Sequence, residues 1–168
     1  IGNPALSEKK ITKKTIFVIE ASSYQLDYSK IFTSKYALIL NITPDHLERH
    51  KNLKNYVNAK FKLLDSQSNR SIALVKDNDP LISKAIKKGK FKQKIIKVDT
   101  LKNNKIFDQL KNQYFSSFGN RENISFILKI SRILKLDNKK LLKTLNKFKG
   151  LKYRQQIIFE KKNLTVIN

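Results

Sequence analysis

The chain has 168 residues, of which 40% are hydrophobic, and a chain of this length can bury the core of one domain. It contains no cysteine, which excludes a disulfide framework and thiolate metal sites. No apolar run approaches the roughly 20 residues needed to cross a bilayer, and no signal-peptide-like segment opens the chain. We therefore expect a soluble, cytoplasmic protein that does not associate with a membrane.

The formal net charge of +23 raises the question of nucleic-acid binding, because clustered lysine and arginine neutralise phosphates. Two features argue against a dedicated nucleic-acid surface. Only five of the 36 basic residues are arginine, the residue type that makes bidentate contacts with bases and phosphates. The lysines are also spread along the whole chain. We interpret them as solvated surface residues and keep a basic nucleic-acid-binding module as the alternative.

The two ends of the sequence suggest a piece of a longer protein. Methionine is absent, the chain opens on Ile1, and it closes on an apolar run that begins at Leu164. We expect residues 1–168 to be part of one domain that is incomplete at both ends.

Short runs of β-branched and aliphatic residues predict buried strands. They lie at residues 15–19, 37–42, 71–75 and 94–98. Between them, helical spacing of apolar residues predicts a helix over 53–66 and a second helix that starts at Pro80. Strands that alternate with helices predict βαβ units and a largely parallel sheet flanked by helices, an α/β fold.

The last third of the chain predicts two more helices and a hairpin. Broad apolar faces cover residues 123–136 and 138–148, and Gly150 is the expected stop of the second helix. The runs 156–160 and 164–167 flank a short polar turn and predict a closing β-hairpin.

Polar side chains follow the first two predicted strands. Glu20, Ser22 and Ser23 come after the first strand, and Asp45 and His46 come after the second. Ligands of open α/β sheets bind at the carboxyl ends of the strands. Carboxylates are typical Mg²⁺ ligands, so the pattern suggests an enzyme that handles nucleotides.

Each of these residues also has a plain structural interpretation. Glu20 fits a solvated strand end as well as it fits a Mg²⁺ ligand. His46 and His50 are four residues apart, but a zinc site would need a third ligand that the sequence does not supply. From spacing alone, Lys60 is one more solvated lysine on an amphipathic helix.

Three ordered motifs resemble the central domain of the Mur ligase family. They are Glu-Ala-Ser-Ser-Tyr-Gln-Leu-Asp from Glu20, Asn-Ile-Thr-Pro-Asp-His-Leu-Glu-Arg-His from Asn41, and Tyr-Val-Asn-Ala-Lys from Tyr56. The Ser-Ser-Tyr-Gln-Leu sequence is similar to the members that add D-glutamate, and the resemblance extends over essentially the whole chain. It implies a P-loop-NTPase-like α/β fold.

The resemblance implies two Mg²⁺ ions and ATP as cofactors. Glu20 corresponds to the Mg²⁺ ligand beside the ATP phosphates, and His46 corresponds to a ligand of the second ion. Lys60 corresponds to a lysine that is carbamylated in the family, which turns it into an anionic metal ligand. The resemblance therefore makes Lys60 a metal ligand, whereas spacing alone indicates a solvated surface lysine.

Further residues correspond to substrate and nucleotide contacts of the family. Ser22 and Ser23 fall in the loop that faces the muramoyl substrate. Asn120 and Asn123 match the nucleotide-binding asparagines of a His-Asn-x-x-Asn motif, and Arg154 matches the catalytic arginine that approaches the ATP phosphates.

The chain departs from the family pattern in several places. Gly119 stands where the motif has histidine, which removes one expected contact on the adenine side. The segment 99–117 is shorter than the strand-containing segment that the family usually has at this position. The glycine-rich phosphate loop expected upstream, the Asp-Ser-Lys segment expected after Asn168, and the C-terminal domain that holds D-glutamate are not in the sequence. We therefore expect the fragment alone to be inactive.

The implied reaction is ATP-dependent formation of an amide bond in peptidoglycan synthesis. ATP phosphorylates the carboxylate of UDP-N-acetylmuramoyl-L-alanine, and the amine of D-glutamate attacks the acyl phosphate. The full-length enzyme is expected to be a monomer without a specific nucleic-acid partner. Another Mur-type or folylpolyglutamate-synthase-like ligase is the nearest alternative.

Overall fold

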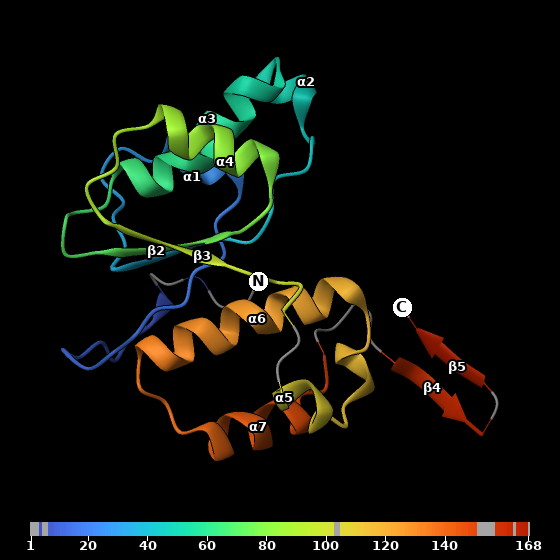
Figure 1. Ribbon diagram of the computed structural model, residues 1–168. Helices are drawn as coiled ribbons and strands as arrows, with labels where there is room; N and C mark the ends of the chain where they lie inside the picture. The colour runs from blue at the N-terminus through green and yellow to red at the C-terminus, as the bar shows by residue number, and fades with distance from the viewer. Residues whose placement is uncertain (1–3, 5–6, 103–104, 151–156, 163, 168) are drawn as a thin grey trace.

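The computed structural model describes residues 4, 7–102, 105–150, 157–162 and 164–167. Its centre is a parallel sheet in which β2 lies between β1 and β3 (Figure 1). The strands are β1 (Tyr36–Ile39), β2 (Ile72–Lys76) and β3 (Lys94–Val98). Leu38 pairs with Leu74, and Leu74 pairs with Ile96. The predicted parallel α/β sheet is confirmed.

Helices cover both faces of this sheet (Figure 1). One layer contains α1 (Ser23–Tyr28), α3 (Leu53–Asp65) and α4 (Pro80–Lys88), with α2 (Leu47–His50) next to α3. The other layer contains α6 (Phe118–Ile133), with α5 (Lys105–Asp108), the 3-10 helix η2 (Gln113–Phe115) and α7 (Asn138–Lys147) packed beyond it.

The central strand β2 is buried on both faces. Ala73, Leu74 and Val75 have no exposed surface, and alternate side chains of a strand point to opposite faces. Ala73 and Val75 belong to the apolar cluster that includes α3 and α4, whereas Leu74 packs in the cluster that contains Phe126 of α6. The apolar run of β2 therefore requires a helical layer on each side.

Side-chain caps fix where the helices begin. Asn52 caps α3, and Asp79 caps α4 with Pro80 in its first turn, so both helices start where the sequence predicts. α6 begins five residues before the predicted 123, because the Ser117 hydroxyl accepts a hydrogen bond from the Asn120 amide. At its other end α7 stops at Lys147 with Phe148 as C-cap, so Gly150 lies beyond the helix that it was expected to end.

The predicted strand at residues 15–19 is wrong. The segment is irregular, and Ile16 and Val18 are 79% and 95% exposed. A strand needs a hydrogen-bonded neighbour, and within the described residues β1 is the edge of the sheet on one side and β3 on the other. The composition of residues 15–19 favours a strand, but the described part of the chain gives it no partner.

The C-terminal hairpin is confirmed. β4 (Ile157–Lys161) pairs antiparallel with β5 (Leu164–Ile167), with an irregularity in the register between Ile157 and Phe159. Within the described residues, no helix combines the length and the hydrophobicity that crossing a membrane requires.

Leu74 provides a test of this packing. Leu74→Ala should lower the free energy of unfolding by about 2–5 kcal/mol, because it removes buried methyl groups and leaves a cavity between two helical layers. Leu101→Ala is the control, since Leu101 is 67% exposed, and it should change stability by less than about 0.5 kcal/mol. Urea unfolding followed by circular dichroism measures both. Equal losses in the two variants would contradict the central position of β2.

Candidate functional site

The first motif forms the start of α1. The Ser22 hydroxyl accepts a hydrogen bond from the Gln25 amide at 3.2 Å, and the Ser22 amide donates to the Gln25 side chain at 2.8 Å. This reciprocal capping box fixes the first turn of the helix. Glu20 is exposed two residues before the cap, in the irregular segment that replaces the predicted strand.

The second motif forms the turn after β1. The Asp79 carboxylate accepts a hydrogen bond from the Ile42 amide at 3.2 Å while it also caps α4. His46 then adopts a left-handed conformation with φ 53°, and its amide donates to the Asp45 carboxylate at 2.8 Å. A non-glycine residue in this conformation is uncommon and is held by its surroundings.

Aromatic rings bring the three motifs together. Tyr24 of α1 packs on His46 and on His50, with ring centroids 4.9 and 5.6 Å apart. His50 packs on Tyr56 of α3 at 5.5 Å, and the Lys60 ammonium lies 5.0 Å from the Tyr56 ring centroid. We call Tyr24, His46, His50 and Tyr56 the aromatic cluster. Lys60, which is half-buried, borders it.

The two serines of the first motif have different surroundings. Ser22 is exposed and serves as the helix cap, whereas Ser23 is 4% exposed. The Ser23 hydroxyl lies 3.0 Å from Nε2 of His50, which is itself 5% exposed. His50 therefore satisfies a buried hydroxyl and fixes α1 against the turn that carries His46.

His46 has two acidic neighbours. Its ring nitrogens lie 3.4 Å from Asp45 Oδ2 and 3.9 Å from Glu48 Oε1. Imidazole and carboxylate groups are suitable donors for a divalent cation. No group of three or more His, Asp or Glu side chains in the described residues converges to hold a metal ion, so these residues supply only part of a ligand set.

An ion pair joins the end of α1 to α3. The Lys62 ammonium donates to the Asp27 carboxylate and to the Asp27 carbonyl oxygen, both at 2.7 Å. The hydrogen bond from Lys62 is the largest influence on the carboxyl group and lowers the pKa of Asp27, although desolvation acts in the opposite direction. The pair holds the first motif against the helix that carries Lys60.

The predicted nucleotide-binding residues lie on α6, in the other helical layer. Asn120 is buried and donates from Nδ2 to the Tyr114 carbonyl at 2.6 Å, whereas Asn123 is exposed. A Cβ atom at Gly119 would meet no atom within 4 Å, so the backbone leaves room for the histidine that the family motif has there. Arg154 lies outside the described residues.

A buried ion pair ties α6 to the carboxyl end of the sheet. Lys76 at the end of β2 pairs with Glu122, and the Thr100 hydroxyl donates to the same carboxylate oxygen at 3.0 Å. Glu122 is 9% exposed, and a buried carboxylate requires such partners. The network places the first turns of α6, which carry Asn120 and Asn123, beside the ends of β2 and β3.

Sequence reasoning missed the residues that position the site. His50 was considered only as a zinc ligand, and its contact with Ser23 is made across 27 residues, so no local pattern indicates it. Asp79 can be identified from the sequence as a helix cap, because it directly precedes Pro80. Its hydrogen bond with the Ile42 amide cannot be identified in this way. Tyr24 and Tyr56 lay within the recognised motifs without an assigned role.

Comparison with known proteins supports the resemblance. A family model described as the Mur ligase middle domain matches residues 1–145. The UDP-N-acetylmuramoylalanine--D-glutamate ligase of Rickettsia prowazekii is 35% identical over 185 residues, which cover 100% of this chain and 41% of the relative. The enzymes of that name from Rickettsia bellii and Pseudothermotoga lettingae are 33% and 32% identical, over 94% and 100% of this chain and 39% and 40% of theirs. The chain thus spans about two fifths of the length of these relatives.

The stabilisation that the Asp27–Lys62 ion pair gives to the fold should depend on pH. Because the folded-state pKa of Asp27 is lowered, its stabilisation is fully present above the ordinary aspartate pKa of about 3.9 and disappears as the pH falls through the lower folded value. Asp27→Asn should therefore reduce the free energy of unfolding at pH 7 by up to about 1 kcal/mol, the range of half-exposed ion pairs. The difference from the parent chain should shrink towards pH 3.

Urea unfolding at pH 7, 5 and 3 measures this difference. Asp108→Asn is the matched control, because Asp108 is exposed and has no ion-pair partner within the described part of the chain. A loss for Asp27→Asn that stays constant down to pH 3 would mean that the charge of Asp27 does not stabilise the fold.

Proposed function

Because the chain belongs to the Mur ligase family as a middle domain, we propose that it is the ATP-binding part of a longer ligase that joins D-glutamate to UDP-N-acetylmuramoyl-L-alanine. The relatives that cover the whole chain carry the name of that enzyme. The Ser-Ser-Tyr-Gln-Leu sequence in the first motif supports this specificity over other Mur-type and folylpolyglutamate-synthase-like ligases. The reaction belongs to peptidoglycan synthesis, and we place it in the cytoplasm.

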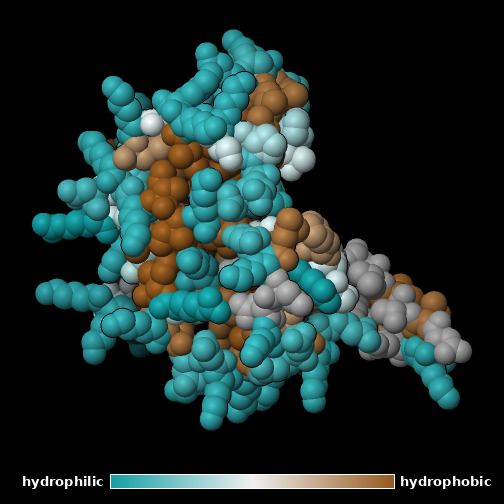
Figure 2. Space-filling model, viewed as in Figure 1, coloured by the Kyte–Doolittle hydropathy of each residue, from teal (hydrophilic) through white to brown (hydrophobic). Residues whose placement is uncertain are grey.

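The observation that carries the proposal is the meeting of three motifs that are distant in sequence. His46 belongs to the aromatic cluster, and Ser23 and Lys60 each contact another of its members. A nucleic-acid-binding module would not require this arrangement. Figure 2 shows hydrophilic side chains distributed around the viewed face and separated by exposed hydrophobic residues, which does not favour a continuous basic surface there.

The proposed chemistry proceeds in two steps. ATP phosphorylates the alanyl carboxylate, with ADP as leaving group, and the amine of D-glutamate then displaces phosphate from the acyl phosphate. Negative charge accumulates between phosphate and carboxylate oxygens in both steps, and bound Mg²⁺ supplies the charge neutralisation that such reactions need.

We assign the metal-binding roles to Glu20, His46 and Lys60. His46 lies between two carboxylates in an exposed turn that Asp79 fixes to the sheet, so it is accessible and held in place. Carbamylation of Lys60 would require its neutral amine to attack CO₂ and release one proton. The product is an anion. It would supply an oxygen ligand to the metal site, whose ligand set the described carboxylates and imidazoles do not complete by themselves.

The remaining roles concern substrate and nucleotide. Ser22 is exposed at the start of α1 and is available to the muramoyl substrate, whereas Ser23 acts through its contact with His50. Asn123 is exposed on α6 and is the better placed of the two asparagines for contact with ATP, because the Asn120 amide is bonded to Tyr114. Arg154 is proposed to approach the ATP phosphates on the basis of its motif.

Lys60 is the sharpest test of the assignment. In the full-length protein that carries this chain, Lys60→Ala should lower kcat by about 100-fold or more, because several kcal/mol of charge stabilisation depend on the metal site. Lys54→Ala is the control, since Lys54 is exposed on the same helix, and it should retain full turnover. Phosphate release with ATP, Mg²⁺ and both substrates is the measurement, and acetate or formate should partly restore Lys60→Ala. Unchanged turnover in Lys60→Ala would make Lys60 a surface lysine.

The isolated 168-residue chain gives a second test. It should release no phosphate above background with ATP, Mg²⁺, UDP-N-acetylmuramoyl-L-alanine and D-glutamate, because the glycine-rich loop that cradles the phosphates in this family is not in its sequence. The full-length protein should release phosphate only when both substrates are present. Substrate-dependent turnover by the isolated chain would show that the described residues suffice for catalysis.

A further inference from the structure

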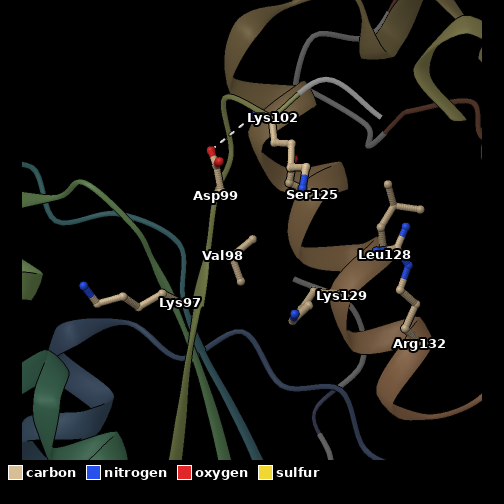
Figure 3. A pocket seen from close by; sticks show the side chains of 8 residues that line it. All are labelled: Lys97, Val98, Asp99, Lys102, Ser125, Leu128, Lys129 and Arg132. Atoms are coloured by element: carbon tan, nitrogen blue, oxygen red, sulfur yellow. Dashed lines mark hydrogen bonds between the residues drawn. The ribbon is translucent and has the colours of Figure 1, made fainter. Parts of the chain in front are cut away.

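A hollow lies between β3 and α6. Its volume is about 480 Å³, within the range of small-molecule sites. Val98 of β3 and Leu128 of α6, both at least 95% buried, form its apolar floor. Lys102, Lys129 and Arg132 line it with positive charge (Figure 3).

Within the part of the chain that the structure describes, the three cations lack acidic partners. Lys102, Lys129 and Arg132 form no ion pair with a carboxylate in the described ranges. Lys129 is half-buried, and a lysine in such a position can pack its stem on apolar surface while its ammonium faces solvent or a ligand. Lys97 is different, because Figure 3 shows its side chain directed away from α6, and its ammonium pairs with Asp77 at 3.4 Å.

One oxygen of the single carboxylate in the lining is already hydrogen-bonded to the backbone. Asp99 Oδ1 accepts hydrogen bonds from the amides of Leu101 and Lys102 at 3.0 and 3.1 Å (Figure 3). This turn brings Lys102 back over the hollow and directs the carboxylate into the loop. Ser125 is also occupied, since its hydroxyl donates to the Arg121 carbonyl at 3.2 Å. The cations therefore dominate the charge of the hollow.

We propose that this hollow binds a small phosphorylated molecule. Arg132 offers a planar guanidinium that can hold two phosphate oxygens at once, and Lys102 and Lys129 offer point charges. Val98 and Leu128 provide a surface for the apolar part of the ligand. Neither Asn120 nor Asn123 of α6 lines the hollow, and the site does not depend on the proposed ligase activity.

The shape of the hollow favours a small ligand over a nucleic acid. A polymer contacts a protein through a row of cations that follows its backbone. Here the unpaired cations surround one hollow with a buried apolar floor, and the other lysines are spread over the chain. A single phosphate or diphosphate group fits this arrangement.

Binding of inorganic pyrophosphate to the purified chain tests the proposal. Isothermal titration calorimetry should show saturable binding with one site per chain. The double variant Lys129→Gln/Arg132→Gln should bind at least tenfold more weakly, because charge-assisted hydrogen bonds to phosphate are lost. The control Lys139→Gln/Lys143→Gln removes two exposed lysines of α7 and should change the dissociation constant by less than twofold.

Amide chemical shifts locate the binding and confirm that the variants are folded. Pyrophosphate should move the signals of Leu128, Lys129 and Arg132 more than those of Asn120 and Asn123. Absence of saturable binding, equal weakening in both double variants, or shift changes centred on Asn120 and Asn123 would each overturn the proposal. Competition with single-stranded RNA is the last measurement. The proposal would also be overturned if this RNA prevented pyrophosphate binding in the parent chain and its own binding were unaffected by the Lys129→Gln/Arg132→Gln substitutions.

Discussion

The burial of β2 on both faces is the constraint on which the other features depend. Ala73, Leu74 and Val75 are removed from solvent completely, so the sheet needs an apolar layer on each of its faces. The layer of α3 and α4 and the layer of α6 satisfy this requirement. Because the three strands are parallel, their carboxyl ends share one edge, and the loop that leaves β1 at this edge carries Asp45 and His46. The fold thus creates the position of the site before any polar contact is made.

Two carboxylates that follow the sheet then fix the functional segments. Asp79 accepts three backbone amide hydrogen bonds, from the turn after β1 and from the first turn of α4, and bonds to a charged acceptor are stronger than neutral ones. Glu122 links the ends of β2 and β3 to α6 through Lys76 and Thr100. Each carboxylate connects two elements. The turn with His46 and the start of α6 are therefore both held against the same sheet. The left-handed backbone of His46 is itself held by the hydrogen bond from its amide to Asp45 and by the packing of its ring on Tyr24.

Most of the fold could be predicted from the sequence, because its elements have local causes. The runs at β1, β2 and β3 are aliphatic and short, and the caps at Asn52 and Asp79 are visible as residue types. Residues 15–19 have the same composition but no strand beside them in the described chain, and pairing is not encoded in one segment. In the site, too, local features could be predicted from the sequence and tertiary contacts could not. The motifs with Glu20, His46 and Lys60 were recognised by resemblance, whereas the bond from His50 to Ser23 depends on tertiary packing that spacing does not reveal.

The surroundings of Lys60 bear on how its proposed modification would be controlled. The ammonium lies over the face of Tyr56, and the negative face of an aromatic ring stabilises a cation. A carbamate in the same place would lose this contact and would present an anion to the ring. The modified side chain therefore needs a compensating positive charge, which a metal ion near His46 would provide. In the proposed site, metal binding and carbamylation of Lys60 favour each other by the same free energy, as linkage requires. Under this proposal the unmodified lysine would be favoured without metal, and the ligand set would be completed only when the cation binds.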